Sequence, residues 1–211
     1  MFKGRKYPNT RLRRLRQNSN IIDLVSENKL TSSDLIQPIF LKENLKGQEL
    51  IESMPDIYRY DDECALKEIE NIINSGINTI AVFPIIDPSK KDKAGKEAVN
   101  KNNYISNSIK KIKNNFPEIT LIADIALDPY TDHGHDGIVI NQEVENDETI
   151  KILSDQSLLL AQAGADILAP SDMMDGRIGL IRNTLEKERF KNTIIMSYAA
   201  KYNSKFYGPF R

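Results

Sequence analysis

Short apolar runs separated by amphipathic segments recur along the chain from residue 35 onward. The runs are rich in β-branched and aliphatic residues and do not alternate with polar ones, which is typical of strands buried on both faces. The amphipathic segments between them place apolar residues at helical spacing. Strands that alternate with helices in this way predict a parallel sheet in an α/β fold. The predicted strands cover residues 35–41, 79–83, 120–127, 165–170 and 193–198.

The helices begin and end at residues typical of helix termini. A helix is expected over 61–75, because it starts with acidic residues, carries apolar Ala65 and Ile69 on one face, and is followed by Gly76. Asp175 stands where an N-cap residue would begin a later helix. The remaining helices are expected over about 100–115, 147–164 and 176–190.

Two sheet architectures fit this pattern. An open, doubly wound sheet would be complete with five strands, whereas an eight-stranded (β/α) barrel typically needs about 250 residues. No glycine-rich phosphate loop follows the first strand, which argues against the dinucleotide-binding form of the open sheet. The pattern alone leaves both architectures open.

The first 34 residues differ from the rest of the chain. Arg11, Arg13, Arg14 and Arg16 lie within six positions and precede a short apolar segment, 21–25. Such a cluster is typical of nucleic-acid or anion contact, or of an arm that packs on a neighbouring subunit. We favour the arm, because no further basic stripe continues the patch. The expected organisation is therefore an oligomerisation arm over 1–34 and one larger domain over 35–211.

Composition narrows the function classes. A length of 211 residues with 40% hydrophobic and 28% charged residues describes a globular protein of one or two domains. The net charge of −1 argues against a nucleic-acid or membrane-surface role for the whole molecule. The sequence contains no apolar run of about 18 residues and no apolar core of a secretory signal near Met1. The lone Cys64 excludes an intramolecular disulfide and a cysteine-based zinc cluster. We expect a cytoplasmic protein.

The most polar strand end follows the third predicted strand. In parallel α/β folds the active site collects at the carboxyl ends of the strands. This loop is either a solvated turn or a metal or acid/base site, and its lack of cysteine favours harder ions than zinc. The gathering of both histidines of the chain here favours the functional interpretation. Its ionisable residues are Asp124, Asp128, Asp132, His133, His135 and Asp136.

Two other strand ends carry candidate chemistry. Ser171 and Asp172 follow a strand and have no evident capping duty, whereas Met173 and Met174 are expected to pack. Lys201 closes the last apolar strand, where desolvation would lower its pKa and free the amine for Schiff-base chemistry. The alternatives are a lysine that reaches solvent, or the same role for Lys205.

Three segments, DIALDPYTDHGHDGI, AGADILAPSDMMDGRIG and MSYAAKYNSKFYGPFR, together resemble the porphobilinogen synthase (delta-aminolevulinic acid dehydratase) family, in the order that this family has them. Earlier segments such as NTRLRRLR, QPIFLKE and SMPDIYRY are similar as well, so the resemblance covers residues 7–211. It implies a (β/α)8 TIM barrel with an N-terminal arm that wraps a neighbouring subunit, usually in a homo-octamer. It also implies a lyase that condenses two 5-aminolevulinate molecules to porphobilinogen, with loss of two waters, in haem biosynthesis.

The resemblance also implies roles for single residues. Lys201 matches the first of two Schiff-base lysines, and Arg211 matches an arginine that binds a substrate carboxylate. Asp124 and Ser171 match polar residues that line the site, with Asp124 as a proton acceptor or orienting group. Tyr207 matches a residue that packs near the substrate.

The chain departs from the zinc-dependent members of the family. Those members carry three cysteines in the loop after the third strand, and here Ala126, Asp128 and Asp136 stand at these positions. The sequence therefore resembles the aspartate-rich branch, which implies magnesium or potassium and no catalytic zinc. No magnesium ligands are assigned, and His135 is not expected to bind zinc.

A second departure concerns length, because the family continues beyond the segment that matches Arg211, with three more strands and the second lysine. We therefore expect a fragment of a longer protein, or a 211-residue chain without catalytic turnover. A truncated, inactive paralogue that joins full-length subunits is the alternative. A class I aldolase-like enzyme that uses Lys201 on another carbonyl substrate is a further one.

Overall fold

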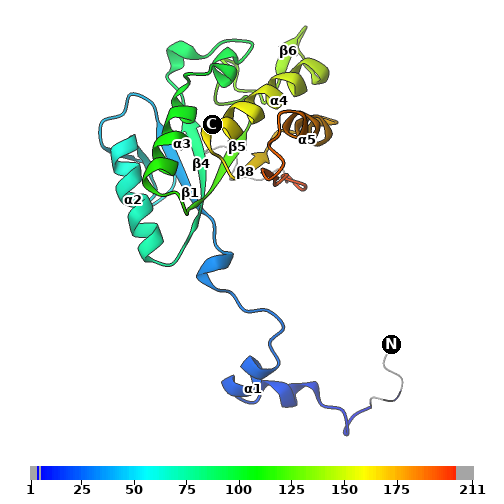
Figure 1. Ribbon diagram of the computed structural model, residues 1–211. Helices are drawn as coiled ribbons and strands as arrows, with labels where there is room; N and C mark the ends of the chain where they lie inside the picture. The colour runs from blue at the N-terminus through cyan, green and yellow to red at the C-terminus, as the bar shows by residue number, and fades with distance from the viewer. Residues whose placement is uncertain (1–3, 5, 203–211) are drawn as a thin grey trace. The chain divides into compact units, whose positions relative to one another are not determined.

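The computed structural model describes residue 4 and residues 6–202, and the chain forms two compact units, Met1–Asp34 and Leu35–Arg211 (Figure 1). The first unit contains a 3₁₀ helix, η1 (Leu12–Arg16), and a short helix, α1 (Ser19–Leu24). The Asn18 side chain caps α1 by accepting a hydrogen bond from the Ile21 amide at 3.0 Å. None of the described residues of this unit is buried, and large apolar side chains such as Leu24 remain exposed.

The second unit is built on a mostly parallel sheet. Its strands follow the order β2-β3-β1-β4-β5-β8-β9, and only β2 and β3 pair antiparallel. From β1 to β9 the described strands follow chain order without the reversal that defines a doubly wound sheet, which argues against the open-sheet alternative. The bounds are β1 (Gln37–Lys42), β2 (Gln48–Leu50), β3 (Tyr58–Tyr60), β4 (Thr79–Ile85), β5 (Thr120–Ile125), β8 (Ile167–Pro170) and β9 (Ile194–Ile195). A separate hairpin pairs β6 (Ile138–Ile140) with β7 (Glu143–Glu145).

Four helices pack in sequence beside the strands, since α2 contacts α3, α3 contacts α4, and α4 contacts α5 (Figure 1). Aliphatic side chains of the strands and helices form one buried core, in which Ile69, Ile109 and Leu121 are fully enclosed. The helices are α2 (Asp62–Asn74), α3 (Tyr104–Asn115), α4 (Asn146–Ala163) and α5 (Arg177–Lys187). Short 3₁₀ helices are η2 (Ser32–Asp34), η3 (Pro88–Lys90) and η4 (Lys96–Val99).

All five expected strands and all four expected helices occur, with shifted ends. The prediction that Asp175 caps α5 is wrong, because Gly176 in the left-handed region (φ 79°) is the N-cap residue. The Asp175 amide instead donates to the Asn146 side chain at 2.8 Å. The same helix ends at Lys187 rather than near residue 190, and Arg189 then adopts a positive φ of 69°.

Backbone hydrogen bonds between the last strand and β8 continue beyond the two residues of β9. The Met196 amide donates to the Leu168 carbonyl at 2.9 Å, and the Tyr198 amide donates to the Pro170 carbonyl at 3.2 Å. The chain thus runs beside β8 as far as the point where β8 ends. This path brings Lys201 to the carboxyl edge of the sheet.

Candidate functional site

The polar residues predicted from three strand ends lie together at one edge of the sheet. Asp124 is on β5, Ser171 directly follows β8, and Lys201 follows the strand that contains β9. These strands are neighbours and parallel, so their carboxyl ends meet. The Lys201 ammonium donates hydrogen bonds to the Ser171 carbonyl at 2.7 Å and to Asp136 Oδ2 at 3.2 Å.

The acidic loop after β5 divides into a buried and an exposed part. Asp136 is buried, with a side chain that is 7% exposed, whereas Asp132, His133 and His135 are exposed. The two histidine rings lie side by side, with centroids 5.5 Å apart. Asp136 therefore turns inward, whereas the two histidines that drew attention to this loop lie on its outer side.

Burial changes the acidity of two carboxyls around Lys201. Burial raises the pKa of Asp124 to about 7, and the charges of Asp136 and Asp172 add to this, while a hydrogen bond from Ser171 and the charge of Lys201 oppose it. Burial likewise raises the pKa of Asp128, with contributions from the contact with Asp136 and the charge of Asp124. Asp124 Oδ1 has no hydrogen-bond partner among the described residues. Near neutral pH these groups are suited to give or take a proton.

Asp172 is fixed by the loop that follows β8. Its Oδ1 accepts a hydrogen bond from the Met174 amide at 2.8 Å, and burial raises its pKa, although the Met174 amide and Arg177 oppose this. Arg177 Nε lies 3.1 Å from Asp172 Oδ2 as an ion pair without hydrogen-bond geometry. A second guanidinium nitrogen of Arg177 donates to the Met174 carbonyl at 2.7 Å. Arg177 was not predicted as a site residue; its signal in the sequence is a cation in the first turn of a helix, where the macrodipole disfavours it.

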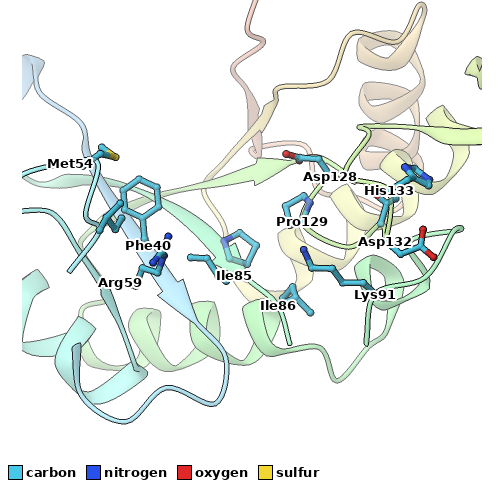
Figure 2. A pocket seen from close by; sticks show the side chains of 14 residues that line it. Phe40, Met54, Arg59, Ile85, Ile86, Lys91, Asp128, Pro129, Asp132 and His133 are labelled. Atoms are coloured by element: carbon cyan, nitrogen blue, oxygen red, sulfur yellow. The ribbon is translucent and has the colours of Figure 1, made fainter. Parts of the chain in front are cut away.

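A cavity of about 480 Å³ opens beside this cluster, with Asp128 in its wall (Figure 2). Phe40, Met54 and Arg59 line one side, and Lys91 and His133 line the other. Arg59 is held by an ion pair with Glu49 at 2.6 Å. The cavity thus combines an apolar lining with two cations and two carboxylates, which suits a small organic molecule with polar groups. Its remaining lining residues are Ile51, Pro84, Ile85, Ile86, Pro129, Thr131, Asp132 and Gly134.

A family model described as delta-aminolevulinic acid dehydratase matches residues 9–211 of the chain. This chain belongs to the delta-aminolevulinic acid dehydratase family. The delta-aminolevulinic acid dehydratase of Methanothermus sociabilis is 49% identical over 206 residues, which are 98% of this chain and 63% of that protein. That of Chlamydia pneumoniae is 48% identical over 201 residues, which are 95% of this chain and 60% of that protein.

A crystal structure of the delta-aminolevulinic acid dehydratase of Toxoplasma gondii ME49, in complex with the reaction product porphobilinogen, superposes with a TM-score of 0.92 at 41% sequence identity. The superposition covers 96% of this chain and 58% of that one. The chain therefore spans about three fifths of the length of these members of the family.

Some residues that the family resemblance singles out lie outside the described residues. They are Tyr207 and Arg211, together with Lys205, the rival of Lys201. Their predicted roles stay predictions. Within the part of the chain that the structure describes, none of the helices is long and apolar enough to cross a membrane.

The donor set for a metal ion is incomplete in the described part of the chain. Asp128 and Asp136 supply carboxylate oxygens in the loop after β5. Among the described residues, however, no group of three or more His, Cys, Asp or Glu side chains is placed to hold a metal ion. These residues alone do not fit a metal centre, and we derive no chemical step through one.

Proposed function

We propose that this chain carries the part of a porphobilinogen synthase active site that contains Lys201. Porphobilinogen synthase is a lyase that condenses two 5-aminolevulinate molecules to porphobilinogen for haem biosynthesis. Family membership supports the reaction. The observation that carries the proposal is the position of the Lys201 ammonium, between the Ser171 carbonyl and the Asp136 carboxylate at the edge of a parallel sheet.

The proposed first step is formation of a Schiff base. Lys201 passes a proton to Asp136, and its free amine attacks the ketone carbon of 5-aminolevulinate. The ketone oxygen takes one proton from the attacking nitrogen and one from a neutral carboxyl and leaves as water, so that an iminium forms on Lys201. Asp124 and Asp128 are suited to supply this proton, because burial raises the pKa of both.

The iminium then acts as an electron sink for carbon–carbon bond formation. It acidifies the carbon next to the former ketone, and a carboxylate within reach accepts that proton. Asp124 is the proposed acceptor, since its Oδ1 has no hydrogen-bond partner among the described residues. Arg211 is the proposed ligand of a substrate carboxylate, and Tyr207 a neighbouring packing residue.

The proposed ions are Mg²⁺ or K⁺ rather than a catalytic Zn²⁺. Ala126, Asp128 and Asp136 stand where zinc-dependent members of the family carry cysteines, and carboxylate oxygens favour harder ions than thiolates do. No ligands for these ions are assigned, since no group of three or more His, Cys, Asp or Glu side chains among the described residues is placed to hold a metal ion.

The proposed assembly is a cytoplasmic homo-oligomer, an octamer by family resemblance, of (β/α)8 barrels with arms over residues 1–34. The strand order from β1 to β9 supports the barrel, because it follows chain order with parallel pairing. The exposed leucines of the first unit support a partner surface for the arm. The proposal that the 211-residue chain does not turn over by itself is tested by assaying the purified chain for porphobilinogen.

Reductive trapping tests the Schiff base directly. The protein is incubated with 5-aminolevulinate, reduced with borohydride and digested, and the peptides are analysed by mass spectrometry. We expect the reduced adduct on Lys201, its loss in Lys201→Met, and no adduct with dihydroxyacetone phosphate, a substrate typical of class I aldolases. An adduct on Lys201 with the aldolase substrate, or no adduct with 5-aminolevulinate, would refute the proposal.

A further inference from the structure

The contact between Lys201 and Asp136 depends on a loop of irregular structure. Asp136 lies between β5 and the β6–β7 hairpin, outside any helix or strand. Such a segment has few backbone hydrogen bonds of its own, so other groups must fix the direction of the carboxylate. Two buried threonines make hydrogen bonds to the backbone on either side of Asp136.

Thr131 holds the segment that precedes Asp136. Its side chain is buried, and its hydroxyl donates to the His135 carbonyl at 2.9 Å. Thr131 is itself anchored by its neighbours, because the Asp92 amide donates to the Tyr130 carbonyl and the Asp132 amide donates to the Asp92 carbonyl, both at 3.2 Å. The His135 carbonyl, directly before Asp136, is therefore held in place by Thr131.

Thr149 holds the segment that follows Asp136. It lies in the first turn of α4 and is fully buried. Its hydroxyl accepts a hydrogen bond from the Ile138 amide at 2.9 Å and donates to the Glu145 carbonyl at 2.5 Å. The chain between these two threonines passes through Gly137, where an added Cβ would lie 3.0 Å from Thr149 Oγ1.

We propose that Thr131 and Thr149 are positioning residues, which hold the backbone on both sides of Asp136 so that its carboxylate meets the Lys201 amine. The proposal rests on the Schiff-base function proposed above. Neither hydroxyl is needed for the chemistry itself, since each is directed at a backbone group. Valine has the shape of threonine without the hydroxyl, so Thr→Val releases the loop, whereas Thr→Ser keeps the hydrogen bonds.

A carboxylate beside an amine favours the protonated form of the amine. If Asp136 moves away from Lys201, the free amine is present at lower pH, and the pH midpoint of adduct formation falls. Other ionisable groups among the described residues around the pair are unchanged in these variants; they include Asp124 on β5, Asp128 in the same loop, Asp172 with Arg177 after β8, and Tyr198.

The experiment measures the initial rate of borohydride trapping of 5-aminolevulinate on Lys201 against pH. Any pH dependence of the reductant is common to all variants and cancels in the comparison. We expect Thr131→Val and Thr149→Val to lower the midpoint by about one pH unit, in the direction of Asp136→Asn. Thr131→Ser and Thr149→Ser should keep the midpoint of the original protein.

Two controls separate positioning from general destabilisation. Thr184→Val removes a hydroxyl that contacts Ser154 Oγ at 2.7 Å on the α4–α5 interface, and it should leave the midpoint unchanged. In the Asp136→Asn background, Thr149→Val should produce no further shift. An unshifted midpoint in both valine variants, or an equal shift in Thr184→Val, overturns the positioning role. Absence of any adduct in the original protein instead refutes the Schiff-base function.

Discussion

At the scale of single residues, the site gathers several charged side chains in a poorly solvated region. Among the described residues, Asp124, Asp128 and Asp136 lie near Lys201, and the ion pair of Asp172 with Arg177 lies near Asp136. Four carboxylates would outnumber two cations in a poorly solvated region, which is costly in free energy. Protonation of some carboxyls lowers this cost. The pKa of Asp124 is raised because burial and the neighbouring carboxylates favour its protonated form. The proton held in this way is available for water loss from the substrate.

The first prediction concerns the pH dependence of stability at Asp124. Its pKa is raised from 3.8 to about 7, so the folded state binds a proton that the unfolded state releases in this window. The free energy of unfolding therefore falls as pH rises from about 4 to 7. Asp124→Asn removes this titration. Urea unfolding should show the variant gaining about 3 kcal/mol relative to the original protein between pH 5 and pH 8. Parallel pH curves for the two proteins would contradict the assignment.

The next prediction concerns the close packing around Gly137, which follows Asp136. A Cβ added there would lie 2.6 Å from Val144 Cγ1 and 3.1 Å from Met174 Cε. We expect Gly137→Ala to lower the free energy of unfolding by about 1–3 kcal/mol and to slow adduct formation on Lys201. Gly179→Ala is the matched control, because a Cβ at Gly179 in α5 meets nothing within 4 Å and should stabilise the helix. Equal stability changes in the two variants would show that Gly137 is not tightly packed.

At the scale of elements, apolar runs and capping residues account for what could be predicted. The strand over 79–83 and the helix over 61–75 both occur, because their residues become buried and Asp61 caps the helix. The short strands β2, β3, β6 and β7 were missed. They have three residues each and only partly buried or exposed side chains, so their pairing comes from tertiary contacts rather than from an apolar pattern.

The start of α3 illustrates how one buried side chain sets a boundary. The helix was expected from about residue 100, but it begins at Tyr104, after Asn103. Asn103 is fully buried; its Oδ1 accepts from the Ser106 amide at 2.9 Å, and its amide group donates to the Glu97 carbonyl at 3.2 Å. Asn103 thus joins the 3₁₀ helix η4 to α3.

We predict that Asn103→Ala lowers the free energy of unfolding by about 1–3 kcal/mol, because it removes the cap and the hydrogen bond that Asn103 donates to the buried Ala98 carbonyl at 3.3 Å. Urea unfolding measures the change. Asn115→Ala at the other end of the helix is the control, since its side chain is exposed and donates only to the Lys111 carbonyl at 2.8 Å. This control should change stability by less than about 0.5 kcal/mol. Equal losses in the two variants would argue that burial at Asn103 is unimportant.

At the scale of the whole molecule, the site residues that could be predicted are those at the carboxyl ends of the strands. Asp124, Ser171 and Lys201 are adjacent because parallel neighbouring strands end together, and this can be inferred from the sequence. Arg177 and the two positioning threonines contact backbone or carboxylate groups that are close to them in sequence, but these contacts follow no helix or strand period, so the apolar pattern does not reveal them. The cavity beside Asp128 likewise joins segments from Phe40 to Gly134 that only the fold brings together.

The last prediction concerns the first unit and the proposed arm. Leu12 is 73% exposed and Leu24 is 84% exposed, although leucines in contact with a partner would each stabilise association by about 1.5–3 kcal/mol. Replacing both with serine should therefore weaken self-association strongly, and analytical ultracentrifugation should show smaller species at equal concentration. Asn20→Ala changes an exposed polar residue between them and should leave the sedimentation profile unchanged. If the double variant sediments like the original protein, these leucines do not form the oligomer contact, and the arm must associate through its arginines or remain free of the partner.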